Sequence, residues 1–363
     1  MVGLRDMSPD TAPLLTSLLE QVSRSFYKTL WILPRSVRPQ ISLAYLLARA
    51  TDTIADTEMV PREQRLDALR RFRGRIVGAH REPLDFGAMA ARQGSSGERV
   101  LLQQAEEACG LLDACSEEDR TCIREVLQTI LSGQELDLQR FSNATADRIV
   151  ALQTDAELDD YTYRVAGCVG EFWTKMCQAH VFGPPTCRSA RAGTERDETG
   201  REIDAASDAS IEKLGVRFGK GLQLVNVLRD LPVDLRRGRC YLPADKLRTA
   251  GLAPADLLQP ENEPRLRPLY NSYLDLAHEH LAAGWQYTNL VPGSSPRIRL
   301  ACAWPILIGV RTLALLRGVH VLDPARRIKV PRAEVKGILL RSVLSLPVPP
   351  LWRRLFARAS GVA

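Results

Sequence analysis

Apolar residues recur three or four positions apart along almost the whole of this 363-residue chain, and no convincing run of alternating apolar and polar residues interrupts them. Few aromatic residues (6%) and many Leu, Ala and Arg also favour helix over sheet. We therefore predict an all-α protein, with helices near residues 12–31, 40–58, 62–79, 97–115, 117–140, 155–182, 209–235, 264–290, 297–319 and 331–346.

Turn-forming sequences separate the predicted helices. A polar, charged segment at about 188–208 is expected to be a solvated loop. Similar helical patterns resume on both sides of every break, so nothing requires a domain boundary. We predict one helical domain over residues 1–363.

The net charge of +6 is unevenly distributed along the chain. From Arg297 onward the sequence contains 13 Lys and Arg residues but only two acidic residues, Asp323 and Glu334. A basic C-terminal region is typical of proteins that bind nucleic acid, an anionic membrane or a phosphorylated ligand. The basic residues are interleaved with Leu, Val and Trp, and no zinc-finger spacing or RNP motif occurs, so we expect no nucleic-acid partner.

The eight cysteines are scattered without a CxxC pair, and most lie in apolar helical patterns. The N-terminus has no signal-peptide pattern, and the most apolar run, 300–316, is interrupted by Pro305 and Arg311. We expect reduced, buried thiols in a cytoplasmic protein that does not obviously span a membrane. A monomer is the favoured state.

Two pairs of aspartates break the amphipathic pattern in the same way. Asp52 and Asp56 lie in an apolar helical run, and Asp230 and Asp234 lie near the end of another. Residues four apart project from one helix face, where two like charges cost about a few tenths of a kcal/mol. A shared cation would offset that cost, and paired carboxylates suit Mg²⁺ that also binds substrate phosphate oxygens. One such pair alone would more often be a solvated acidic face.

Basic and amide side chains accompany both pairs. Arg49 lies one turn before the first pair, and Arg229 abuts the second. Gln223 and Asn226 lie seven and four residues before Asp230, on the same helical face. The recurrence of this combination predicts a metal-dependent site for a phosphorylated substrate.

Four motifs, in order, resemble those of the squalene/phytoene synthase family. Asn226 to Pro243 is similar to the family's second aspartate-rich motif, and Tyr45 to Asp56 resembles the first. The segment 161–170 resembles its tyrosine-containing central helix, and 23–26 (Ser-Arg-Ser-Phe) its N-terminal motif. The similarity runs from about residue 20 to 345.

The resemblance implies a single-domain class I isoprenoid synthase helical bundle with a central cavity. The two Asp motifs would face each other across its mouth, with Mg²⁺ between them and farnesyl diphosphate as substrate. Catalytic roles would fall to Tyr161, Tyr45 and Arg229. Metal binding would fall to Asp52, Asp56, Asn226, Asp230 and Asp234, and substrate or diphosphate binding to Ser23, Arg24, Phe26, Arg49, Gln223, Arg229 and Arg239.

Within the family, residues 302–315 and 328–332 are more similar to squalene synthases than to phytoene synthases. This likeness implies head-to-head condensation of two farnesyl diphosphates through presqualene diphosphate, followed by reduction to squalene with NADPH. Lys329 and Arg332 would contact NADPH, although a surface salt-bridge role suits them nearly as well. No GxGxxG follows a strand, so NADPH would bind without a Rossmann unit.

Several departures keep other outcomes open. Ala55 and Val233 stand where relatives often carry Glu, and 299–301 lacks the aromatic residues of animal squalene synthases. The same first step could therefore end at dehydrosqualene, presqualene diphosphate or hydroxysqualene, or the substrate could be geranylgeranyl diphosphate and the product phytoene. A non-catalytic assembly or scaffold relative is the alternative of another class, and the retention of all four Asp argues against it.

The C-terminal tail, about 347–363, is basic and amphipathic. It has two interpretations. The tail could make peripheral contact with an anionic membrane, which would place the protein on the inner membrane face. It could equally be a frayed, solvated terminus.

Overall fold

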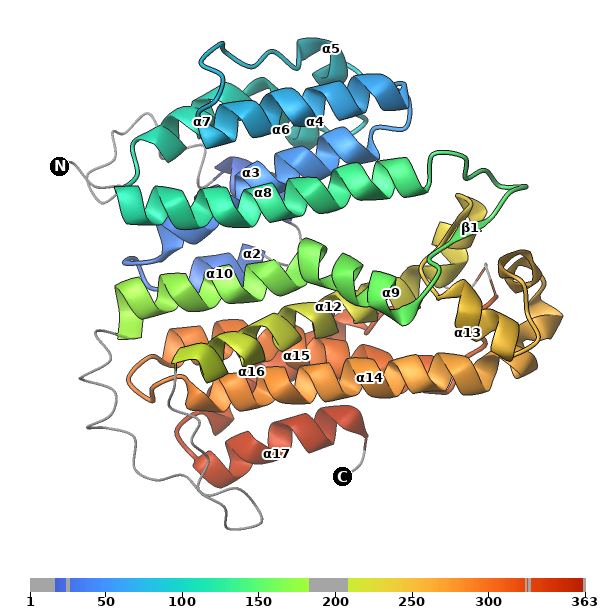
Figure 1. Ribbon diagram of the computed structural model, residues 1–363. Helices are drawn as coiled ribbons and strands as arrows, with labels where there is room; N and C mark the ends of the chain where they lie inside the picture. The colour runs from blue at the N-terminus through green and yellow to red at the C-terminus, as the bar shows by residue number, and fades with distance from the viewer. Residues whose placement is uncertain (1–16, 24–26, 183–207, 324, 326–327, 362–363) are drawn as a thin grey trace. The chain divides into compact units, whose positions relative to one another are not determined.

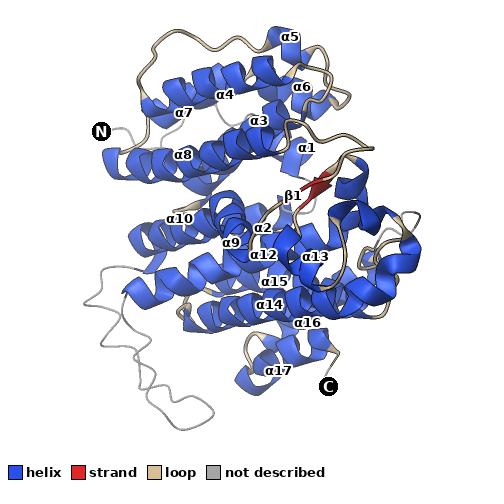
Figure 2. Ribbon diagram, turned by 45° about the vertical axis from the view of Figure 1, so that its right-hand side comes forward, coloured by secondary structure: helices blue, strands red, loops and turns tan. Residues whose placement is uncertain are grey.

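The computed structural model describes residues 17–23, 27–182, 208–323, 325 and 328–361. The contacts divide the chain into two compact units. Unit 1 is Met1–Gln139 with Phe172–Glu202, and unit 2 is Arg140–Glu171 with Ile203–Ala363. Helix dominates both units (Figure 2), which confirms the all-α prediction. The single domain expected from the sequence stays a prediction.

Unit 1 is built from helices in the N-terminal part of the chain (Figure 1). They are α1 (Leu19–Ser23), α2 (Tyr27–Ile32), α3 (Arg38–Asp56), α4 (Arg62–Val77), α5 (Gly87–Ala90), α6 (Ser96–Gln103), α7 (Ala105–Asp113) and nearly all of α8 (Glu117–Arg140). The C-terminal part of α10 (Cys168–Cys177) and the π-helical turn η5 (Gln178–Phe182) complete it. The predicted helix at 97–115 is two helices, α6 and α7, which meet at Gln104.

Helix α3 shows why this unit folds as its apolar pattern predicts. Pro39 occupies the first turn, where its missing N–H costs nothing, and the Arg38 guanidinium donates to the Leu33 carbonyl at 2.6 Å. The inner face, which includes Leu43, Leu47 and Ile54, is fully buried. The opposite face of α3 is therefore left for polar residues.

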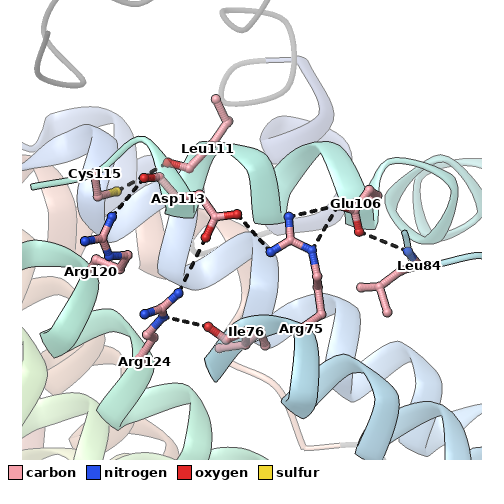
Figure 3. Close-up of polar contacts among 9 residues, drawn as sticks. All are labelled: Arg75, Ile76, Leu84, Glu106, Leu111, Asp113, Cys115, Arg120 and Arg124. Atoms are coloured by element: carbon pink, nitrogen blue, oxygen red, sulfur yellow. Dashed lines mark hydrogen bonds and ion pairs between the residues drawn. The ribbon is translucent and has the colours of Figure 1, made fainter. Parts of the chain in front are cut away.

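A buried arginine ties α4 to α7 (Figure 3). Arg75 donates to Glu106 at 3.0 Å and to Asp113 at 2.8 Å, and its side chain is only 12% exposed. Burial alone would lower the pKa of Arg75, but the hydrogen bonds to the two carboxylates outweigh it and raise that pKa. Glu106 also accepts the Leu84 backbone N–H at 2.9 Å. The guanidinium therefore holds both carboxylates in place.

We expect Arg75→Ala to lower the free energy of unfolding by about 1–3 kcal/mol, because it removes the charged hydrogen bonds that join α4 to Glu106 and Asp113 of α7. Arg71→Ala is the matched control on the same helix. Arg71 pairs with Asp67 at 3.1 Å, but both side chains are more than half exposed, so its loss should cost less than about 0.5 kcal/mol. Urea denaturation of the two variants compares them, and equal losses would contradict the expectation.

Unit 2 is built around three long helices, α12 (Asp208–Arg236), α14 (Glu263–Leu290) and α15 (Pro296–Arg317), which pack on one another. The segment α9 (Asp155–Thr162), the π-helical turn η4 (Tyr163–Gly167) and the start of α10 run beside α12. The remaining elements are β1 (Val150–Ala151), β2 (Arg239–Cys240), α13 (Ala244–Thr249), the 3₁₀ turns η6 (Pro254–Leu258) and η7 (Pro260–Asn262), α16 (Arg332–Ser345) and α17 (Pro349–Ser360).

Small residues let the α9–α10 segment approach α12 closely. A Cβ on Gly170 would lie 1.8 Å from the Gly215 carbonyl oxygen, and one on Gly219 would lie 2.0 Å from that of Ala166. Backbones at this separation leave no room for a methyl group. The small residues that follow Tyr161 therefore serve helix packing.

The tail forms helix α17, so a frayed terminus is wrong for Pro349–Ser360. Trp352 is buried and stacks on Trp285 of α14, with ring centroids 5.2 Å apart, and its indole N–H donates to Asn289 at 2.8 Å. Leu355 is buried beside it. The inner apolar face of the tail is thus occupied by unit 2 itself.

The seven cysteines in the described part of the chain are all free; Cys187 lies outside it. Burial raises the pKa of Cys109 and Cys240 to about 12, so these thiols stay protonated. Within the same residues, α15 is the one helix long and apolar enough to cross a membrane, and 61% of its most apolar window is buried inside the protein.

Candidate functional site

The first acidic pair lies on the polar face of α3 in unit 1. Tyr45, Arg49, Asp52 and Asp56 follow one another at steps of four, three and four residues, so they share one helix face. Asp52 and Asp56 are the only acids of this helix, and its last turn has no basic residue. The predicted first motif is therefore assembled on a single face, with Arg49 one turn away.

Two residues that the sequence did not single out hold this face in place. Gln134 of α8 donates its amide N–H to Asp52 at 2.6 Å, and Glu98 of α6 accepts from Arg49 at 2.5 Å. Arg49 also lies 4.0 Å from Asp52, so its guanidinium is shared between two carboxylates. Neither partner stands at a motif-like spacing from the Asp pair, and both are brought in by helix packing.

The surroundings of Asp52 disfavour the ionised form of its carboxyl group. Burial and then the negative charge of Asp56 raise its pKa from 3.8 to about 6, against the opposing effects of Arg49 and Gln134. The side chain is 47% exposed, so water reduces the penalty that burial alone would impose. The direction is nevertheless clear, because a like charge one turn away opposes ionisation.

Both acidic pairs lie at the C-terminal ends of helices. Asp56 is the last residue of α3, and Asp234 falls in the last turn of α12. The helix dipole is negative there, which disfavours a carboxylate and favours a cation. One aspartate of each pair therefore lies where a carboxylate is disfavoured and a bound positive ion is favoured.

The second pair, in unit 2, has its own arginine. Arg229 donates to both oxygens of Asp230, at 2.9 and 2.5 Å, and these bonds raise the pKa of Arg229. Pro232 lies between the two aspartates within α12 and cannot donate to the Leu228 carbonyl, one turn earlier. Buried Tyr270 of α14 fills that gap, because its hydroxyl donates to the Leu228 oxygen at 2.9 Å. The helix therefore continues through the proline and reaches Asp234.

A chain of polar contacts joins the predicted tyrosine to this motif. The Asn226 amide donates to Gln223 at 3.3 Å, and the Gln223 amide donates to the Tyr161 hydroxyl at 3.1 Å. Tyr161 is 9% exposed. The structure thus brings Tyr161, Gln223 and Asn226 together, with Gln223 two turns and Asn226 one turn before Asp230 on α12.

An aromatic group extends this cluster toward Arg239. The Tyr161 and Tyr241 rings stack with centroids 4.5 Å apart, and the Phe141 ring meets Tyr241 edge-on at 5.2 Å. The Arg239 guanidinium lies 6.0 Å from the centre of the Phe141 ring. Strand β2 pairs in parallel with β1, which fixes Arg239 and Tyr241 in this position. Sequence reasoning missed the roles of Phe141 and Tyr241, because their ring contacts join residues that are far apart in the chain.

The donors present in each motif fit Mg²⁺. They are carboxylate and amide oxygens, the ligands that this ion prefers. Beside Asp52, the Gln134 Oε1 atom is buried and has no hydrogen-bond partner among the described residues. No group of three or more His, Cys, Asp or Glu side chains gathers in that part of the chain, so each motif offers two carboxylates. Mg²⁺ usually takes one or two protein carboxylates and fills its other positions with water and phosphate oxygens.

The remaining predicted residues are placed as follows. Ser23 is buried, and its hydroxyl donates to the Leu19 carbonyl within α1. Arg24 and Phe26 lie outside the described residues, as do 188–207 of the predicted loop. Lys329 and Arg332 are both exposed, just before and at the start of α16. The convergence of the two Asp motifs, and all the roles assigned to these residues, stay predictions.

A cavity of about 480 Å³ opens in unit 2, on a different face of α9 from Tyr161. Asp155, Leu158, Asp159 and Thr162 line it at helical spacing, so Tyr161 points elsewhere. Its polar groups are already paired, because Asp155 accepts from Tyr273 at 2.6 Å and Asp159 lies 2.7 Å from Lys220. This cavity is distinct from the predicted site.

Comparison with known proteins identifies the family of this chain and accords with its helical fold. The family model of squalene/phytoene synthases matches residues 19–334, so this chain belongs to that family. It is 28% identical over 320 residues to the presqualene diphosphate synthase of Rhodopseudomonas palustris, covering 87% of this chain and 92% of that protein. The phytoene synthase of Mycobacterium tuberculosis is 25% identical over 336 residues, covering 90% and 89%.

Among solved structures, a squalene synthase in complex with a ligand superimposes with a TM-score of 0.71. The match covers 98% of each chain at 19% identity. At that identity the likeness concerns the fold, and it supports a helical isoprenoid synthase architecture.

Proposed function

We propose that this protein condenses two molecules of farnesyl diphosphate head to head and releases presqualene diphosphate, with Mg²⁺ as cofactor. The observation that carries the proposal is the pair of aspartates at each of two helix ends, each with an arginine beside it. The similarity to a presqualene diphosphate synthase along 87% of the chain supports this product.

The chemistry needs what these residues provide. Departure of diphosphate from an allylic carbon leaves a carbocation, so the developing negative charge must be stabilised where it forms. Asp52, Asp56, Asp230 and Asp234 would hold Mg²⁺, which when bound neutralises the departing diphosphate. Arg49 and Arg229 would donate to diphosphate oxygens.

The tyrosine cluster of unit 2 would act at the hydrocarbon end of the substrate. The stacked rings of Tyr161 and Tyr241 offer π-faces that favour a nearby cation, and Phe141 extends the aromatic surface. Because Gln223 donates to the Tyr161 hydroxyl, that oxygen is fixed in orientation. A largely buried aromatic wall also keeps water from a reactive carbocation.

A second candidate product is squalene. The likeness of residues 302–315 and 328–332 to squalene synthases favours it, with Lys329 and Arg332 as the proposed NADPH contacts. Formation of squalene would require presqualene diphosphate to lose its diphosphate and the resulting carbocation to accept a hydride from NADPH. Cytoplasmic localisation, with attachment to the inner membrane face, is part of the same proposal.

Product analysis separates these candidates. The protein is incubated with farnesyl diphosphate and Mg²⁺, with and without NADPH, and the phosphatase-treated lipids are identified by gas chromatography with mass spectrometry. We expect presqualene alcohol in both incubations. Squalene formed only with NADPH would establish the second candidate.

Other outcomes of the same assay contradict the proposal. If the protein consumes geranylgeranyl diphosphate but not farnesyl diphosphate, the proposed substrate is excluded and phytoene synthesis is indicated. Failure to consume either diphosphate, from a folded protein supplied with Mg²⁺, would favour the non-catalytic scaffold.

A further inference from the structure

Helices α16 and α17 expose an apolar surface on the opposite side from the one that unit 2 buries. We define the α16–α17 patch as Leu340, Val343, Leu344, Val348 and Leu351, each between 41% and 65% exposed. Leu340, Val343 and Leu344 share one face of α16, because they lie three and four residues apart. Val348 and Leu351 continue the patch through the turn into the first residues of α17.

This exposure is not a consequence of loose packing. On α16, Ile338 and Ser342 face inward, and the Trp304 indole donates to the Ser342 hydroxyl at 2.9 Å. On α17, Trp352 and Leu355 face inward. Both helices are therefore anchored through one side, and their outer sides carry large apolar residues without a use in the fold. A cluster of this kind on a water-soluble surface indicates an interaction site.

The rim of the patch is uniformly basic. Lys336 lies one turn before Leu340, and Arg354 and Arg358 lie three and seven residues after Leu351, all exposed on the same helix faces. The sequence contains no acidic residue after Glu334, whose carboxylate is engaged by Arg311 at 2.5 Å. Positive charge around an apolar centre is the combination that binds an anionic lipid surface.

We propose that the α16–α17 patch docks this protein on an anionic membrane, with the leucines and valines in the headgroup region and the basic rim against lipid phosphates. The sequence suggested a membrane contact for the tail, but the buried residues Trp352 and Leu355 cannot provide it. Instead the outer face of α16 supplies most of the apolar contact. This inference rests on the membrane attachment named under the proposed function and assigns its surface, but it does not depend on the proposed reaction or product.

Charge argues against a second copy of the chain as the occupant. A two-fold interface places the same patch on both partners, so it would bring two basic rims together, each carrying Lys336, Arg354 and Arg358, with no acid in either rim to pair them. Like charges facing each other across an interface oppose association. An anionic lipid surface has the opposite charge.

Vesicle co-sedimentation tests the proposal with the full-length protein. Vesicles are made of phosphatidylcholine alone or with about a third of phosphatidylglycerol. We expect strong binding to the anionic vesicles, weak binding to the neutral ones, and a decrease with added salt, since exposed charges are screened. Failure of the parent protein to bind anionic vesicles would overturn the proposal.

Two variants and their matched controls locate the surface. Leu340→Ser/Leu344→Ser should reduce partitioning about tenfold or more, because less apolar area enters the membrane. Arg354→Gln/Arg358→Gln should reduce it by about fivefold per charge, and only on anionic vesicles. The controls are Met59→Ser, which is 67% exposed against 65% for Leu344, and Arg70→Gln/Arg71→Gln on α4, all in unit 1.

The controls and the oligomeric state complete the test. All of these positions are exposed, so the melting temperatures of the variants should match that of the parent, and a loss of binding then reports the surface itself. If Met59→Ser weakens binding as much as the leucine variant, the proposal is wrong. It also fails if the parent forms a concentration-dependent dimer that Leu340→Ser/Leu344→Ser abolishes, since the occupant would then be a second copy.

Discussion

Asp52→Asn should lower the rate of farnesyl diphosphate turnover by about a thousandfold or more while making the protein more stable at neutral pH. The rate falls because one of the carboxylates proposed to hold Mg²⁺ becomes a neutral amide, and stabilisation of a departing charge by a bound metal is a large part of such catalysis. Stability rises because the variant removes an anion that burial and the negative charge of Asp56 both disfavour.

The pH dependence of this effect has a definite sign. Folding raises the pKa of Asp52 from 3.8 to about 6, so the folded protein binds this proton more tightly than the unfolded chain does. The contribution of Asp52 to stability is therefore most favourable below pH 4 and is lost as the pH rises through 6. The melting temperature of Asp52→Asn should exceed that of the parent at pH 7.5 and match it near pH 4.

Two comparisons make the experiment specific. Glu118→Gln removes an exposed acid at the opposite, N-terminal end of a helix, α8, so it should lower stability slightly instead of raising it. Asp230→Asn should lose activity equally but gain no stability, because it leaves Arg229 without its carboxylate partner.

Added Mg²⁺ should raise the melting temperature of the parent more than that of Asp52→Asn. Full activity in either Asp variant would contradict the proposed metal site.

Gly170→Ala should destabilise unit 2 by about 3 kcal/mol or more, which would lower its melting temperature by several degrees. The added methyl group would sit 1.8 Å from the Gly215 carbonyl oxygen, and a backbone oxygen cannot move aside as a flexible side chain can. The α9–α10 segment would have to separate from α12, which would disturb the contact between Tyr161 and Gln223.

Gly110→Ala provides the control for Gly170→Ala. Gly110 is an exposed residue of helix α7, and a Cβ there meets nothing within 4 Å. Alanine is favoured over glycine in a helix by up to about 1 kcal/mol, so this variant should be as stable as the parent or more so. Differential scanning calorimetry measures both changes. A stable Gly170→Ala protein would show that the two helices are not held at the separation observed here.

Apolar periodicity predicted most of the helices because each buries one continuous face, as α3 and α14 do. It did not predict the break between α6 and α7 or the π-helical turns, which depend on how neighbouring helices pack. Helix α17 lay in a segment interpreted from charge and amphipathicity alone, and its anchor, Trp352 against Trp285, joins residues far apart in the chain.

The candidate site likewise has a part that the sequence predicted and a part that it could not predict. Local spacing placed Asp52 with Asp56 and Gln223 with Asn226, because residues on one helix face are fixed by the helix itself. It could not reveal Gln134, Glu98 or Tyr241, whose contacts with the motif residues depend on packing between separate elements. The resemblance to a known family supplied Tyr161, whose significance no spacing rule indicates.

The π-helical turn η4 makes the number of residues in this segment as important as their identity. On α12, eight positions separate Gly215 from Gln223, whereas nine separate their counterparts Tyr161 and Gly170 on the facing segment. The wider turn at Tyr163–Gly167 absorbs the extra residue, so both ends of the segment face α12. If the same nine positions were wound as a regular α-helix, without the wider turn, one end of the segment would be rotated by about 100° relative to the other. Either the tyrosine or the glycine would then turn away from α12, even though every side chain named in the site was still present.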